Sequence, residues 1–197
     1  MRGEWCYYKQ AFTEAECDEI VNIGLSGDLG SGVVGDGEWG NSDSITDYDM
    51  RNSDLRFINP GELGTQWIFD KMWRLALEAN KQWFSFHLEE IESFQFTQYD
   101  GSKKQHYREH VDVFWVTRKP SHRKLSAVVQ LSHSDAYIGG DLEFRRLDEY
   151  PDDGQKAEMR LKGSVIFFPS FVSHLVSPVT LGMRHSLVVW IDGPKWR

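Results

Sequence analysis

Apolar and polar residues alternate along the second half of the chain, in short runs that are rich in β-branched and aromatic side chains. Gly, Pro, Asp and Ser separate these runs, which is typical of strands joined by turns. The pattern predicts strands near residues 93–99, 106–116, 125–131, 141–145, 157–161, 164–168, 173–177 and 185–192. Eight short strands within about 100 residues favour a double-sheet jelly roll, the architecture that cupins share.

The first half of the chain has a helical pattern instead. Residues 13–16 (TEAE) have the form of a capping box and predict a helix that runs to about residue 23. Trp67, Ile68 and Met72 recur at helical spacing and predict a second helix over about 65–83. We expect these helices to pack on one sheet of the roll, which makes the chain mainly β with supporting helices (α+β).

Glycine is concentrated between residues 24 and 40, and polar residues continue to residue 54. This composition predicts a long loop. Two interpretations of the segment 24–56 stay open: a lid that closes over a substrate, or a surface loop without such a role.

Length and composition predict one globular domain. The chain has 197 residues, 40% of them hydrophobic and 26% charged. We expect a single domain over 1–197, with helical support and the lid-like loop in 1–93 and the β core in 94–194.

Apolar runs, cysteine content and charge limit the expected cellular location and the expected class of partner. No apolar run is long enough to span a membrane, and the first residues lack the apolar stretch of a secretion signal. Cys6 and Cys17 are the only cysteines, so free thiols in the cytoplasm are the simpler expectation. The net charge of −8 argues against a general nucleic-acid binder.

Two histidines and an aspartate form a candidate metal site. His110 and Asp112 lie two residues apart in a predicted strand, so they should share a face, and His174 should begin a later strand. Two imidazoles and one carboxylate are the ligand set of a non-heme Fe(II) site with open positions. A second His-x-Asp pair, His133 and Asp135, lies in a turn-like stretch without apolar alternation, and we expect it to be a solvated turn.

Arg184 and Ser186 form a candidate anion site at the start of the last predicted strand, again on one face. A guanidinium is a planar fork that suits a carboxylate, and a Ser hydroxyl can add a donor. The alternative is an Arg paired with an internal Asp or Glu, because an unpaired buried charge is costly.

Several segments together resemble a known family, the PKHD-type, prolyl 4-hydroxylase-like Fe(II)/2-oxoglutarate oxygenases. Those segments are Phe96–Tyr99, Tyr107–Asp112, Leu131–Ser132 with Tyr137–Phe144, Phe167–Ser170, and His174 with Val176–Thr180, Gly182, Arg184 and Ser186–Val188. The resemblance covers about residues 94–194, half of the chain, and its motifs are specific in combination.

The resemblance implies a distorted double-stranded β-helix in which His110, Asp112 and His174 bind iron. It also implies that Arg184 holds the C5 carboxylate of 2-oxoglutarate, with Ser186 assisting. Tyr99 matches a tyrosine that faces the co-substrate pocket, or else is a core aromatic. Gln130 lies on the strand that lines this pocket, where several relatives have Tyr.

Other residues keep two interpretations each. Tyr107 should face away from His110 and pack in the core unless a bulge intervenes. Arg51 lies in a segment, 49–53, that resembles one in the family, and it either contacts substrate or is a solvated loop residue. Trp115 either forms a wall of the pocket or packs in the core.

The implied activity is that of a dioxygenase that uses Fe(II), O2 and 2-oxoglutarate, with ascorbate as an optional addition. Such an enzyme hydroxylates an unactivated C–H bond and converts 2-oxoglutarate to succinate and CO2. Its partner would be a peptide, a protein or a small-molecule substrate, not a nucleic acid or a membrane. Two alternatives are a nucleic-acid demethylase of the same superfamily and a non-catalytic jelly-roll binding module. The pattern does not predict the substrate or the oligomeric state.

Overall fold

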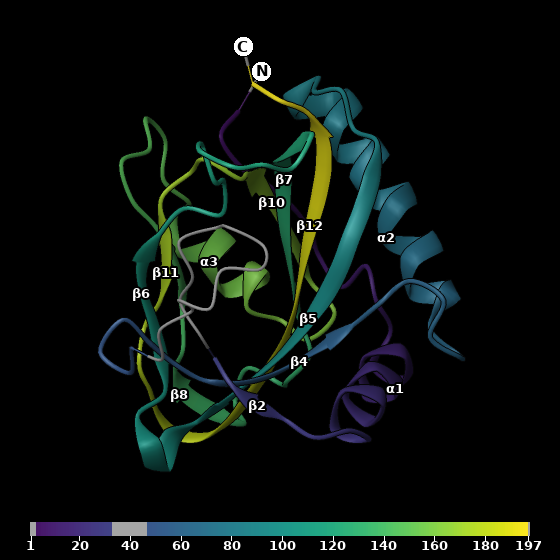
Figure 1. The fold of residues 1–197 in the computed structure, drawn as a ribbon. Coiled ribbons are helices and arrows are strands. Elements are labelled where there is room, and N and C mark those ends of the chain that lie inside the picture. Colours follow the sequence, from purple (N-terminus) through teal and green to yellow (C-terminus); the bar gives the residue numbers. More distant parts are fainter. Residues whose placement is uncertain (1–2, 33–46, 197) are drawn as a thin grey trace.

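Two antiparallel sheets face each other in the computed structural model, which describes residues 3–32 and 47–196 (Figure 1). The larger sheet has the order β1 (Cys6–Tyr8), β10 (Val165–Pro169), β7 (Ser121–Gln130), β12 (Val179–Pro194), β5 (Glu90–Asp100), β4 (Asp54–Ile58) and β2 (Gly30–Ser31), and β8 (Tyr137–Gly139) pairs with β12. The smaller sheet has the order β3 (Arg51–Asn52), β6 (His106–His110), β11 (His174–Val176) and β9 (Leu142–Phe144). This is the predicted mainly-β jelly roll, a double-stranded β-helix.

Side chains alternate along the central strands, so the larger sheet has two buried faces. On β7, Leu125, Ala127 and Val129 belong to the apolar core beneath the helices. Ser126 and Gln130 point the other way, into the space between the sheets, where each contacts a residue of the candidate site. Because strand side chains alternate with period two, one face of β7 supports the fold and the other is available for chemistry.

Two helices cover the outer face of the larger sheet (Figure 1). In α1 (Glu14–Leu25), Thr13 and Glu16 form the predicted capping box, with reciprocal hydrogen bonds at the N-terminus. The second helix, α2 (Gln66–Ala79), is continued by a π-helical turn over Asn80–Phe84. Its apolar stripe, Ile68, Phe69, Met72, Ala76 and Ala79, is buried in the core.

Three expectations about elements were wrong. Residues 157–161 do not form a strand, because α3 (Asp153–Met159) occupies that region behind its own capping box, Asp152 with Gln155. The strand expected over 106–116 ends at His110. The first 93 residues also contribute β1, β2, β3 and β4, which are strands of two to five residues. Strands this short contain too few alternating positions to be recognised by periodicity.

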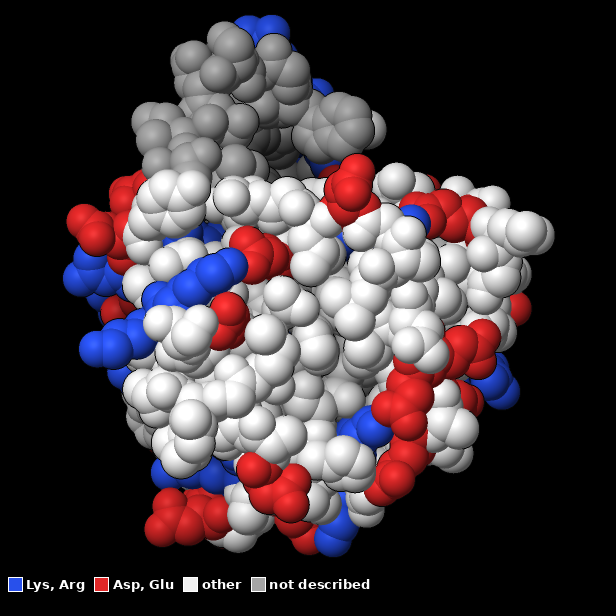
Figure 2. Space-filling model, turned by 90° about the horizontal axis from the view of Figure 1, so that it is seen from below, with Lys and Arg blue, Asp and Glu red and all other residues white. Residues whose placement is uncertain are grey.

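The glycine-rich segment lies only partly within the described residues, since 33–46 fall outside them. Its described flanks are short paired strands: β2 pairs with β4, and β3 pairs with β6. Figure 2 shows one end of the molecule, where acidic and basic side chains lie intermixed around a largely uncharged centre. Among the described residues, no helix combines the length and the apolar character that a membrane crossing requires.

Candidate active site

Two imidazoles meet where β6 ends and β11 begins. His110 and His174 are register partners of the two strands. The Nδ1 of His110 bonds the carbonyl oxygen of Arg108 at 2.8 Å, and the Nδ1 of His174 bonds that of Val172 at 2.9 Å. A carbonyl only accepts, so each Nδ1 carries the proton and each Nε2 presents a lone pair. Burial, together with the nearby His174, lowers the pKa of His110 to about 3, so this imidazole is neutral at pH 7.

Asp112 completes the cluster from a loop and not from the predicted strand. The backbone N–H groups of Asp112 and Val113 donate to the Ser170 carbonyl at 2.9 and 3.0 Å. The Asp112 carboxylate oxygens then lie 3.7 Å from the Nε2 atoms of His110 and His174, one oxygen to each ring. Burial opposes ionisation of Asp112, but the two imidazoles and Arg123 outweigh it and hold its pKa below the usual value.

The donor atoms of His110, Asp112 and His174 all lie within 4.8 Å of one another. Two unprotonated imidazole nitrogens and one ionised carboxylate, turned toward a common point, fit a divalent ion of the Fe(II) type. The backbone bonds at both Nδ1 atoms are the outer contacts that orient histidine ligands in metalloproteins. The residues present therefore suit a ferrous ion.

Ser126 fixes the carboxylate, and the sequence analysis missed it. Its Oγ donates to Asp112 Oδ2 at 2.6 Å and also lies 3.0 Å from the Oγ of Ser170. Both serines are fully buried. The sequence could have indicated Ser126, because it is a polar residue in the mostly apolar predicted strand 125–131. It lies four residues before Gln130 and therefore faces the same side of the strand.

Tyr107 lies against the metal site, contrary to the expected alternation. The register between β6 and β11 shifts, so that His174 pairs with His110 while Val176 pairs with Tyr107. This bulge turns Tyr107 to the same side as His110, and the two rings stack with centroids 3.6 Å apart and an interplanar angle of 15°. Burial raises the pKa of Tyr107 to about 12, so the phenol is neutral.

Arg184 is a buried cation surrounded by neutral groups. Its side chain is 1% exposed. One terminal nitrogen donates to Gln130 Oε1 at 3.0 Å and the other to Ser186 Oγ at 3.4 Å. Tyr99 lies beneath it, with the guanidinium carbon 5.3 Å from the ring centroid.

Arg184 has no anionic partner within the described part of the chain, and its Nε has no acceptor there. The alternative of an internal Asp or Glu partner is therefore not what the structure contains. An unpaired buried guanidinium costs several kcal/mol, which a bound anion offsets. The structure brings Gln130, Ser186 and Tyr99 together around Arg184, and their role in holding 2-oxoglutarate stays a prediction.

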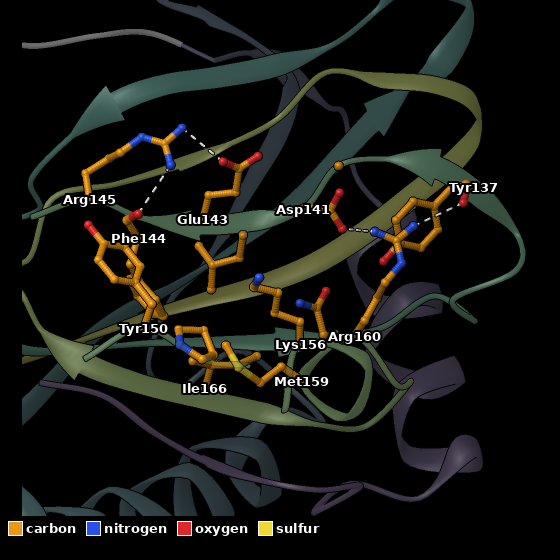
Figure 3. A pocket seen from close by; sticks show the side chains of 14 residues that line it. Tyr137, Asp141, Glu143, Phe144, Arg145, Tyr150, Lys156, Met159, Arg160 and Ile166 are labelled. Carbon is orange, nitrogen blue, oxygen red and sulfur yellow. Dashed lines mark hydrogen bonds and ion pairs between the residues drawn. The ribbon is translucent and has the colours of Figure 1, made fainter. Parts of the chain in front are cut away.

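A cavity of about 440 Å³ adjoins this anion site (Figure 3). Charged side chains lie around it: Glu143 from β9, Arg145 directly after β9 and Lys156 from α3. Ile166 and Met159 form an apolar wall. Gln130 lines the cavity and also bonds Arg184, so the cavity ends beside the Arg184 guanidinium.

The remaining candidates lie apart from this cluster. His133 and Asp135 are exposed residues of a turn, in which the Ala136 N–H donates to the His133 carbonyl. Trp115 is 57% exposed and contacts the ring of His122, so it does not pack in the core.

Residues 94–192 match the family model of the 2OG-Fe(II) oxygenase superfamily. The chain belongs to that superfamily. The matched region contains the three metal-site residues and Arg184, so family membership and geometry concern the same part of the molecule.

Curated relatives that resemble the oxygenase chain are bacterial PKHD-type hydroxylases. One from Shewanella oneidensis is 40% identical over 68 residues, which are 34% of this chain and 28% of the relative. Another from Pseudoalteromonas atlantica is 34% identical over 102 residues, or 50% of this chain and 42% of the relative. The matches thus span less than half of these relatives' length.

Solved structures share the fold over nearly the whole chain. A prolyl-4-hydroxylase from Pseudomonas putida aligns with a TM-score of 0.68 at 23% identity, covering 97% of this chain and 94% of that one. A prolyl hydroxylase from Trichoplax adhaerens, in complex with a peptide fragment, aligns with a TM-score of 0.71 at 16% identity, covering 96% and 83%. At these identities the likeness shows the fold alone.

Proposed function

We propose that the chain is a 2-oxoglutarate-dependent hydroxylase that couples conversion of 2-oxoglutarate and O2 into succinate and CO2 to hydroxylation of an unactivated C–H bond. The proposal rests on two features that occur together. One is the His110–Asp112–His174 cluster, and the other is the cation Arg184, which no described acidic side chain balances. A set of metal ligands alone occurs in many kinds of protein. A buried guanidinium in the same site additionally requires an anion, which an anionic co-substrate would provide.

Each residue has a defined task. The Nε2 atoms of His110 and His174 and the carboxylate of Asp112 would hold the ion, and the Ser126 hydroxyl keeps that carboxylate in place. Arg184 would take the distal carboxylate of 2-oxoglutarate. When bound, the ferrous ion would supply the oxidising chemistry of the reaction.

The protein also protects the reaction. Asp112 would provide a carboxylate ligand where a halide could otherwise bind, which favours hydroxylation over halogenation. Buried side chains between the sheets keep water from the reacting groups.

The test measures succinate formation from 2-oxoglutarate with and without added Fe(II), in the presence of ascorbate. We expect Asp112→Ala and His174→Ala to abolish it and chelation to remove it. The second His-x-Asp pair provides the matched control: a His133→Ala, Asp135→Ala double variant should retain full turnover. Succinate formation that persists in Asp112→Ala contradicts the proposal.

The substrate side of the proposal is a prolyl-type side chain of a peptide, a protein or a small molecule. Its support is that the similar curated proteins are PKHD-type hydroxylases and that the similar folds include prolyl hydroxylases, one with a peptide. A cytoplasmic location is the matching proposal for the cell. Its support is that Cys6 and Cys17 are free and buried, as in a reducing compartment.

A further inference from the structure

A second buried guanidinium lies next to the metal site. Arg51, on the edge strand β3, is 6% exposed. Its guanidinium carbon lies 4.5 Å from the centroid of the Tyr107 ring, and that ring stacks on His110. Arg51, Tyr107 and His110 therefore form one stack that ends at a metal ligand.

Among residues 3–32 and 47–196, no acidic side chain balances the charge of Arg51. Its Nε donates to Ser53 Oγ at 3.1 Å. The terminal nitrogen Nη2 is buried, and no described group accepts a hydrogen bond from it. Nor does any described carboxylate lie within ion-pair distance of the Arg51 guanidinium. The neighbouring cation Arg123 differs, because Glu92 holds it with bonds of 2.9 and 3.0 Å.

The contact with Tyr107 is too weak to explain the burial. A cation over an aromatic ring gains about 0.5–2 kcal/mol, whereas removing a guanidinium from water costs several kcal/mol. An unsatisfied buried donor adds a further cost of about 1–3 kcal/mol. An anionic acceptor at Nη2 would offset both costs.

2-Oxoglutarate does not provide that acceptor, because Arg184 already takes its distal carboxylate under the proposed function. The ferrous ion, Asp112, the 2-oxoglutarate dianion and Arg184 together carry no net charge. Within the described part of the chain, Arg51 is then the buried cation of this site that has no counter-charge.

We propose that Arg51 determines specificity by receiving a carboxylate of the substrate. The substrate is then a free amino acid or a chain end whose carboxylate lies within a few bonds of the hydroxylated carbon. An internal residue of a polypeptide lacks such a group unless it is Asp or Glu, whose side chain has its own carboxylate. This inference rests on the proposed function, because it places the substrate beside the His110–Asp112–His174 cluster.

The test is calorimetric binding to the full chain with Mn(II) and 2-oxoglutarate, without O2. The probes are three forms of each proteinogenic amino acid: the free acid, the N-acetyl acid, which represents a peptide C-terminus, and the N-acetyl methylamide, which represents an internal residue. We expect an acid to bind roughly tenfold to a hundredfold more tightly than its methylamide. Whether the free or the N-acetylated acid binds better distinguishes the two sources of the carboxylate.

Variants connect that preference to Arg51. Arg51→Gln should remove the preference for acid over amide and leave the affinity for 2-oxoglutarate unchanged within about threefold. Arg51→Lys keeps the charge but loses the planar fork, so part of the preference should remain. Arg51→Lys also tests the role of Arg51 if Arg51→Gln does not fold. The matched control is Arg146→Gln, which removes an exposed arginine and should change nothing.

The outcomes are distinct. Equal binding of acids and methylamides by the unaltered chain, or no binding of any probe, overturns the proposal, as does a preference that survives Arg51→Gln. Loss of 2-oxoglutarate binding in Arg51→Gln also overturns it, because Arg51 would then belong to the co-substrate site. Failure of the proposed function would be recognised by a different result. Fe(II)-dependent succinate formation would then be absent, whatever the binding preference.

Discussion

Arg184 and Arg51 are two buried guanidiniums, and they are held in different ways. Arg184 lies on β12, which is paired on both sides by β5 and β7, and two neutral acceptors fix its terminal nitrogens. Arg51 lies on the two-residue edge strand β3, which pairs with β6, and within the described residues its guanidinium donates to Ser53 alone. Each rests on a tyrosine, Tyr99 or Tyr107.

The difference indicates a division of tasks. A central strand holds a cation in one place, which suits a co-substrate that is the same in every turnover. An edge strand with fewer bonds is more easily altered in position and sequence, which suits recognition of a particular substrate. The predictions that follow test whether the two cations act independently.

The largest effect should come from Arg184→Gln. Loss of the charged fork should weaken 2-oxoglutarate binding by roughly a hundredfold or more, while the acid-over-amide preference at Arg51 stays intact. Calorimetry with Mn(II) measures both quantities on one sample. If the substrate preference falls in parallel, the two arginines form one anion site and the comparison fails.

Ser126→Ala should have the next largest effect, on the metal and on neither arginine. The Asp112 carboxylate loses its 2.6 Å hydrogen bond, and removal of such a support typically weakens metal binding by roughly tenfold to a hundredfold. Titration with Fe(II) or Mn(II) measures this affinity. Ser134→Ala, in the exposed turn, is the control; an unchanged metal affinity in Ser126→Ala would contradict the assigned role.

Two glycine substitutions should each disturb one arginine and not the other, with smaller effects than the substitutions above. A Cβ at Gly140 would lie 2.9 Å from the Cδ of Arg184, and a Cβ at Gly32 would lie 2.7 Å from the Nε of Arg51. Gly140→Ala should therefore raise the KM for 2-oxoglutarate several-fold, and more strongly because its φ of +66° disfavours Ala.

Gly32→Ala should lower the acid-over-amide preference and leave that KM alone. Steady-state kinetics and the binding panel give the two readouts. The division is wrong if either substitution changes both readouts equally.

The smallest effect concerns His185, the neighbour of Arg184. Burial, and then the charge of Arg184, lowers its pKa to about 4. The unfolded chain, with a histidine pKa near 6.5, binds the proton first. Stability from this group is therefore complete above about pH 6.5 and is lost as the pH falls toward 4, by about 1–3 kcal/mol.

His185→Gln should flatten that part of the stability curve, as measured by urea unfolding at several pH values with Mn(II) present. Equal slopes for the two proteins between pH 6.5 and 4 would contradict the shift.

The sequence by itself determined the fold class and the list of chemical groups. Alternation along residues 125–131 and 185–192 predicted the central strands, and the capping box at Thr13 predicted α1. Local spacing is sufficient there, because long strands and capped helices contain their own periodicity. Spacing and ligand chemistry indicated His110, Asp112, His174, Arg184 and Ser186, and the resemblance added Tyr99 and Gln130. The structure brings the first three together as a metal cluster and the others together around Arg184.

Tertiary structure decided how those groups face each other. Alternation predicted that Asp112 lies on the same side as His110, but Asp112 reaches the histidines through a loop tied to Ser170 and not through a strand. Tyr107 reaches His110 through a bulge, the one case in which alternation was not expected to turn it away. The unpaired state of Arg184 and Arg51 is also invisible in the sequence. It depends on which acceptors the folded chain brings within reach of each guanidinium, and these come from residues remote along the polymer.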